Sequence, residues 1–171
     1  VTFLGVHDMP RFMNEQGATT EGLKLAQPLI MTSRGTPLLY YGDEIAMPGG
    51  ADPDNRRDFP GGFPGDARNA FTAQGRNPQE NDVFDHLAKL GELRRLHEPL
   101  RRGRSLDLVD EEQQFAYARL TDKAAAIVIF NNDKKPAEVN FEISMIKPIP
   151  PNATLADALG RLPEIRLNGG K

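Results

Sequence analysis

The sequence predicts an α/β segment at residues 1–103 followed by an all-β segment at residues 104–171. Two short apolar runs flank a stretch of helical periodicity near the N-terminus, and a long amphipathic helix follows them. Beyond this helix, short apolar runs recur about every ten residues, which is typical of a small antiparallel β domain. The strand–helix–strand order of the first part predicts parallel strands joined by a crossover helix.

The N-terminal unit begins with the apolar run 1–6, which we expect to be a buried strand because it is too short for a helix. Apolar residues at helical spacing predict a helix over 19–33, with a kink or early break at Pro28, whose ring removes one helical hydrogen bond. Residues 36–41 predict the second buried strand. Polar residues follow both strands directly: His7-Asp8 after the first and Gly42-Asp43-Glu44 after the second.

Residues 46–81 are rich in Gly and Pro, and a loop of this length inside a compact domain is usually functional. Asn81-Asp82 is expected to cap a strongly amphipathic helix that Pro99 and Gly103 terminate. After this helix we expect six short strands, at 105–109, 113–120, 124–130, 136–143, 153–157 and 163–167. Residues 167–171 are typical of a hairpin turn, which indicates that one further strand follows.

The composition excludes several classes of protein. The chain has 21 Lys and Arg against 24 Asp and Glu, a net charge of −3, so no nucleic-acid partner is expected. With 39% hydrophobic residues it has an ordinary globular composition. The absence of Cys excludes disulfides, thiolate zinc sites and a Cys nucleophile. No apolar stretch approaches the length needed to cross a bilayer, and the N-terminus lacks a signal-peptide pattern, so no membrane partner is expected.

His7 and Asp8 form the first candidate site, because they lie where a parallel strand is expected to end. In α/β barrels the carboxyl ends of the strands face the active site. A His beside a carboxylate can take part in acid–base chemistry or bind polar ligand groups. The alternative is a structural turn, since Asp is common in turns.

The second candidate site is the loop 49–58, which alternates carboxylates with arginines. The guanidinium groups of arginine donate hydrogen bonds and carboxylates accept them. Recognition of sugar hydroxyls needs many such donors and acceptors close together. The alternative is a solvated loop whose charges pair with each other. Asp52, Asp54 and Asp58 also alternate like calcium ligands, but the Gly and Glu of an EF-hand are not at their required offsets. No metal site is therefore predicted.

Three segments together resemble the alpha-amylase superfamily of glycoside hydrolases. Residues 3–12 (FLGVHDMPRF) resemble its last signature motif, which ends the seventh strand of a (β/α)8 TIM barrel. Residues 35–44 (GTPLLYYGDE) resemble the eighth strand, and 49–57 (GGADPDNRR) the sugar-binding loop after it. The loop is most similar to neopullulanase- and cyclomaltodextrinase-like enzymes, although Val6 stands where the family usually has Asn. The resemblance implies strands 7 and 8 of a barrel with their helices, followed by an antiparallel β-sandwich.

The resemblance also implies roles for four residues. Asp8 would be the carboxylate that stabilises the transition state, and His7 would bind the sugar at the cleavage subsite. Asp52 and Arg56 would bind sugar hydroxyls further along the glycone side of the substrate. The substrate would be an α-glucan (starch, maltooligosaccharides, cyclodextrins or pullulan), and the parent enzyme would act with retention. Calcium is left open as a cofactor of the parent enzyme.

The family's nucleophile and general acid have no counterpart in this sequence. Retaining glycosidases need these two carboxylates about 5 Å apart, and the family takes them from the fourth and fifth barrel strands. We therefore expect the chain to be the C-terminal portion of such an enzyme and to be inactive alone. Unpaired barrel edges would favour self-association.

Two alternatives stay open. The chain could be a non-catalytic module for glucan binding or interdomain support, or a self-standing protein of unrelated function. The upstream coding sequence discriminates between enzyme and module, because it either encodes the two missing carboxylates or replaces them. The compartment is left open between cytoplasm, periplasm and secretion.

Overall fold

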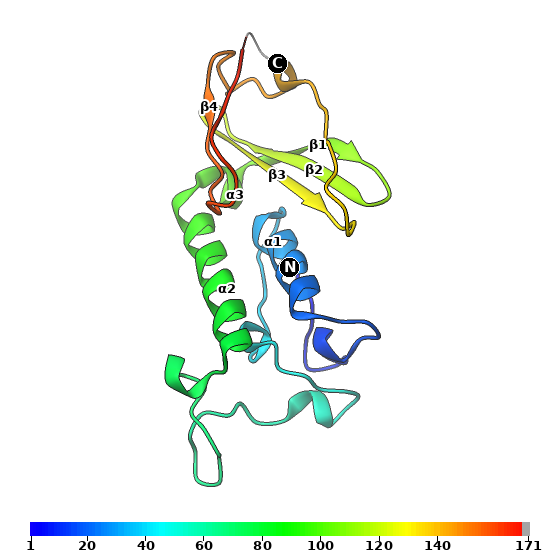
Figure 1. Cartoon of the computed structure of the whole chain (residues 1–171), viewed down its shortest axis with the longest axis vertical. Helices are drawn as coiled ribbons and strands as arrows, with labels where there is room; N and C mark the ends of the chain where they lie inside the picture. The colour runs from blue at the N-terminus through cyan, green and yellow to red at the C-terminus, as the bar shows by residue number, and fades with distance from the viewer. Residues whose placement is uncertain (169–171) are drawn as a thin grey trace. The chain divides into compact units, whose positions relative to one another are not determined.

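The computed structural model describes residues 1–168 as two compact units (Figure 1). Unit 1 comprises Val1–Met31 and Gly35–Gly91, and unit 2 comprises Thr32–Arg34 and the chain from Glu92 onward. The helices are α1 (Thr20–Thr32), α2 (Pro78–Leu96) and α3 (Glu98–Arg102). The strands are β1 (Arg104–Asp110), β2 (Gln114–Leu120), β3 (Ala125–Asn131), β4 (Thr154–Leu155) and β5 (Ile165–Arg166). In residues 1–168, no helix is both long and apolar enough to cross a membrane.

The two strands predicted at 1–6 and 36–41 are wrong as regular strands. The segments meet in a single parallel bridge, between Thr2 and Pro37. Thr2 donates to the Thr36 carbonyl at 3.0 Å, and Leu38 donates to the Thr2 carbonyl at 2.8 Å. A regular parallel strand needs a continuous ladder, and Pro37 has no N–H to extend one. Because this bridge is parallel, the two segments run in the same direction. The polar residues that follow each segment therefore lie at the same end of the pair.

The predicted helix over 19–33 is confirmed as α1, but the early break at Pro28 is wrong. Pro28 lies inside the helix and has no N–H for the carbonyl of Lys24. The Nε2 atom of His86 lies 2.9 Å from that carbonyl. Because a carbonyl only accepts, His86 donates there and replaces the hydrogen bond that proline removes.

The long helix α2 begins one turn earlier than the predicted start at Asn81-Asp82. Asn77 and Glu80 form a reciprocal capping box in which each side chain accepts from the other's backbone N–H, at 2.9 and 2.8 Å. Pro78 then occupies the first helical position, where its missing N–H costs nothing. The helix continues to Leu96, and the short α3 follows directly.

Unit 1 has its apolar core on the facing sides of the two long helices and under the long loop. The buried side chains on α1 and α2 include Leu23, Ile30, Met31, Val83, Leu87 and Leu90. A second cluster of Ile45, Met47 and Ala70 lies under the loop, with Phe59 and Phe84 packed against it.

Unit 2 is built on an antiparallel sheet of order β1-β2-β3, which confirms the first three strands of the β segment. The predicted strand at 136–143 is wrong: Pro136 cannot donate to a ladder, and residues 132–138 are exposed. The strands predicted at 153–157 and 163–167 are present only as β4 and β5, which pair with each other. The predicted hairpin turn at the C-terminal end falls partly on residues 169–171, outside the described residues.

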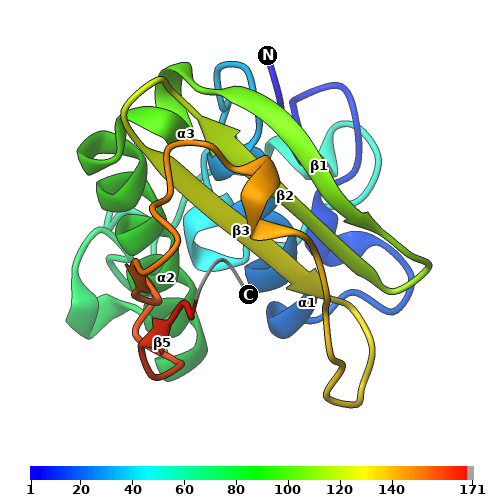
Figure 2. The same cartoon turned by 90° about the horizontal axis from the view of Figure 1, so that it is seen from above.

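One face of the three-stranded sheet is covered by the chain after β3. Figure 2 shows this segment, in orange and red, crossing the sheet. Ala118 and Leu120 on β2 pack with Ile143, Ile146 and Leu167 in one apolar cluster, and Leu155 of β4 packs against it. The second layer is therefore mostly irregular chain with a short ladder, rather than a full second sheet.

Candidate functional site

Arg56 brings the four residues predicted for the site together within unit 1. Its Nε donates to the main-chain carbonyl of His7 at 3.0 Å and forms an ion pair with Asp52, whose Oδ1 lies 2.9 Å away. Its terminal nitrogen lies 3.6 Å from Asp8 Oδ1. His7 Nε2 lies 3.2 Å from the same Asp8 oxygen. Two segments more than 40 residues apart in sequence thus converge on one guanidinium.

The cluster is open to solvent. Some 70% of the Asp8 side chain and 61% of the Asp52 side chain are exposed. Ion pairs exposed to this degree contribute only about 0–1 kcal/mol to stability. A ligand rich in hydroxyl groups can replace part of these pairings at little cost, because the donors and acceptors are already held side by side.

Buried Arg11 holds the backbone beneath this cluster. It is fully buried, donates from Nε to the carbonyl of Asn55 at 2.9 Å and donates from a terminal nitrogen to the carbonyl of Tyr41 at 2.6 Å. Its backbone N–H donates to the carbonyl of Gly49 at 2.9 Å. Arg11 therefore ties together the three sequence segments that carry the predicted motifs.

Asn55 completes this support from the loop that carries Arg56. Its side-chain amide is fully buried and donates to the carbonyls of His7 and Met9, at 2.8 and 3.0 Å. Gly49 allows the close approach, since a Cβ there would lie 2.9 Å from the Asn55 Cα. The turn at His7-Asp8 is thus fixed by side-chain contacts rather than by a strand ladder.

Asp43 lies next to Arg11 and is itself buried, with its Oδ1 3.8 Å from the guanidinium. Burial raises the pKa of Asp43 to about 6, because a charged carboxylate is disfavoured away from water. The Arg11 charge and a hydrogen bond from the main chain act in the opposite direction but do not cancel the effect of burial.

Asp54, another carboxylate of the loop, is also paired with nearby groups. Asp54 accepts from the Gly50 N–H at 2.6 Å and pairs with Arg57, and these two contacts lower the pKa of Asp54. Within residues 1–168, no group of three or more Asp, Glu or His is arranged to hold a metal ion.

Sequence reasoning missed Arg11 and Asn55 as residues of this site. Both lie inside the quoted motifs, but nothing in the sequence distinguishes a buried arginine from an exposed one. The signal that could have found Arg11 is the pair Tyr40-Tyr41 after an apolar run. Both rings pack on its guanidinium, with centroids 4.4 and 4.6 Å away.

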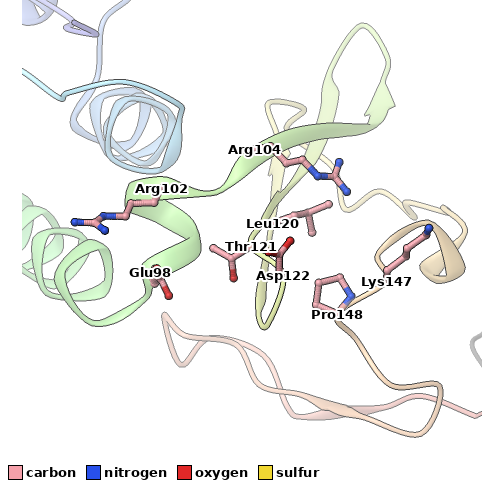
Figure 3. A pocket seen from close by; sticks show the side chains of 8 residues that line it. All are labelled: Glu98, Arg102, Arg104, Leu120, Thr121, Asp122, Lys147 and Pro148. Carbon is pink, nitrogen blue, oxygen red and sulfur yellow. The ribbon is translucent and has the colours of Figure 1, made fainter.

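Unit 2 has a surface hollow of its own. Figure 3 shows its lining side chains, which are Glu98, Arg102, Arg104, Leu120, Thr121, Asp122, Lys147 and Pro148. The lining mixes charges of both signs with apolar groups and contains none of the four predicted site residues.

The comparisons with known proteins define the family. The alpha-amylase catalytic-domain family model matches residues 1–103, so the chain belongs to the alpha-amylase family. The resemblance predicted from the three motifs is therefore confirmed.

The similar proteins named by these comparisons act on α-glucans or related compounds. A cyclomaltodextrinase from Geobacillus thermopakistaniensis is 30% identical over 142 residues, which cover 82% of this chain and 22% of the relative. A cyclomaltodextrin glucanotransferase from Niallia circulans is 30% identical over 99% of this chain and 20% of its own length. The chain thus spans about a fifth of the length of these curated relatives.

Solved structures show the same relationship. The α-amylase of Geobacillus thermoleovorans in complex with acarbose matches with a TM-score of 0.77 and 28% identity, over 98% of this chain and 34% of that one. A debranching enzyme of Nostoc punctiforme matches with a TM-score of 0.71 and 26% identity, over 89% of this chain and 28% of that one.

Proposed function

We propose that this chain is the C-terminal portion of a retaining glycoside hydrolase that acts on α-glucans. In this proposal Asp8 stabilises the positive charge that develops on the sugar in the transition state, while His7, Asp52 and Arg56 bind sugar hydroxyls. The observation that carries the proposal is the convergence of Asp8 and Asp52 on Arg56. Belonging to the alpha-amylase family supports it.

The chemistry of the four side chains fits such a division of roles. A carboxylate that is 70% exposed and has a guanidinium 3.6 Å from one oxygen keeps its other oxygen free to face a sugar ring. An oxocarbenium-like transition state is stabilised by a nearby negative charge that is already in place. The guanidinium offsets repulsion between Asp8 and Asp52 without removing either carboxylate from solvent.

For the domains, we propose the last part of a (β/α)8 barrel at 1–103 and an antiparallel β-sandwich domain at 104–171. The match of the family model to 1–103 and the start of β1 at Arg104 support this boundary. The nucleophile and general acid would come from residues upstream in the parent protein. This chain alone should then release no product from a chromogenic maltooligosaccharide, and any turnover by pure chain contradicts the proposal.

The catalytic role is tested in a protein that joins this chain to upstream barrel residues. Asp8→Asn should lower kcat about a thousandfold or more, since it removes charge that is needed in the transition state. Arg56→Gln should raise KM more than it lowers kcat. Asp85→Asn, on the exposed side of α2, is the matched control and should change neither. An active Asp8→Asn variant would exclude Asp8 from catalysis.

The non-catalytic glucan-binding module remains the second candidate, because the four-residue cluster can bind hydroxyls without the missing carboxylates. The upstream sequence separates the two. An Asp and a Glu in the family's two central motifs would establish the enzyme, and their replacement would favour the module.

A further inference from the structure

A cluster of three phenylalanines lies on the loop that carries the candidate site. Phe59 and Phe71 stack with ring centroids 4.6 Å apart, and Phe63 meets Phe71 edge-on at 6.5 Å. Phe63 and Phe71 are 58% and 63% exposed. We call these three residues the aromatic ledge. Large exposed rings that gather in one place usually mark a binding surface.

The aromatic ledge is part of a closely packed hairpin. A Cβ at Gly61 would lie 2.5 Å from a carbon of the Phe63 ring and 2.7 Å from a carbon of the Phe71 ring, so only glycine leaves room for both rings. Gly61 and Asn69 form an antiparallel bridge. The Phe63 N–H donates to Asp66 at 3.0 Å.

Two arginines fix this hairpin to α2. Arg68 forms a bidentate ion pair with the carboxylate of Glu80, which lies in the first turn of the helix. Arg76 lies 3.9 Å from the centre of the Phe84 ring and donates to the carbonyl of Ala70 at 3.1 Å. Rings held on such a base lose little conformational entropy when a ligand binds.

The position of the ledge indicates what it binds. It belongs to the same long loop before α2 as Asp52 and Arg56. In the barrel proposed for residues 1–103 this loop would follow the eighth strand, at the end of the barrel where ligands bind. In Figure 1 this loop runs in cyan and green and leads into α2. Phe59 follows the loop 49–58 directly and packs on the cluster of Ile45, Met47 and Ala70.

A glucose ring presents hydroxyls at its rim and C–H groups on its flat face. The Arg56 cluster offers partners for the rim, whereas the ledge offers flat apolar rings for the face. We propose that the aromatic ledge is a second sugar-contact surface, which holds glucose units of the same α-glucan beyond those at Arg56. The proposal rests on the proposed function for the substrate class only.

The test is an NMR titration of the full chain with maltoheptaose and, separately, with maltose. Phe71→Ala and Phe63→Ala should each weaken maltoheptaose binding about three- to tenfold and leave maltose binding unchanged, because only the long ligand reaches the ledge. Phe71→Tyr should retain binding. Leu162→Ala, an equally exposed apolar residue of unit 2, is the matched control. Circular dichroism checks that each variant is folded.

The outcomes separate this proposal from the proposed function. Unchanged maltoheptaose binding in both alanine variants overturns the ledge, whatever Arg56→Gln does. If the alanine variants instead change only the sedimentation of the chain, the ledge is a contact between copies and the proposal is wrong. If Phe71→Ala weakens maltoheptaose binding while Arg56→Gln does not, the aromatic ledge is supported as a sugar-contact surface and the proposed role of Arg56 is wrong.

Discussion

Arg11 in unit 1 and Arg119 in unit 2 are both fully buried, yet they hold different parts of the chain. Arg11 donates to the carbonyls of Tyr41 and Asn55, which belong to the segments that form the candidate site. Arg119 donates to the carbonyl of Gly103 at 2.6 Å and to that of Thr32, where a helix and a strand begin or end. The same side chain therefore organises a site in one unit and joins structural elements in the other.

The difference reflects how each unit is stabilised. Unit 2 has a ladder of backbone hydrogen bonds and an apolar cluster, and Arg119 adds to them. Around His7-Asp8 the backbone has a single bridge, so Arg11 and Asn55 supply the missing contacts. A site fixed by a few buried side chains should be more sensitive to single substitutions than a sheet is.

The largest effect is expected from Arg11→Met. It should lower the free energy of unfolding by about 3–5 kcal/mol, because it leaves Asp43 and two carbonyls buried without their partner. Denaturant unfolding followed by circular dichroism measures this loss. A loss below about 1 kcal/mol would show that Arg11 is not the main support of the site.

The second effect concerns Asp43 and the dependence of the free energy of unfolding on pH. The pKa of Asp43 in the folded chain is about 6, above its ordinary value of 3.8, so the native state holds this proton more tightly than the unfolded chain. The contribution of Asp43 is therefore most favourable below about pH 4 and is lost as pH rises to about 6, by roughly 3 kcal/mol.

Asp43→Asn should remove that slope between about pH 4 and pH 6. The measurement is the free energy of unfolding of both proteins at several pH values across this range. Parallel profiles for the two proteins would show that Asp43 is not the titrating group. Arg11→Met should move the pKa of Asp43 still higher, since the Arg11 charge lowers it.

The smaller effect is expected from Arg119→Met, at about 2 kcal/mol, because two carbonyls lose a charged donor while the sheet and its apolar cluster remain. At temperatures where the variant is folded, maltoheptaose binding should be unchanged. Weakened binding, or a loss of unfolding free energy as large as that of Arg11→Met, would remove the contrast between the two arginines.

Local patterns predicted much of the fold. Periodicity predicted α1 and β1 to β3, and three motifs predicted the family, Arg56 and the three residues that meet at it. The strands at 1–6 and 36–41 could not be judged from their own residues, because a strand also depends on the partners that pair with it. Arg11 and Asn55 were missed since their side-chain hydrogen bonds join residues 30 to 48 apart. The sequence offers two candidate caps for α2, Asn77 with Glu80 three residues later and Asn81-Asp82, and the structure uses the first.

In the proposed function, Arg56 gathers Asp8 and Asp52 into a site for α-glucans. An NMR titration of the full chain with acarbose, comparing wild type, Arg56→Gln and the exposed control Arg166→Gln, tests it most directly. We expect Arg56→Gln to weaken binding about tenfold or more, because a charged donor is lost, and the control to leave binding unchanged. Equal binding by all three proteins would contradict it.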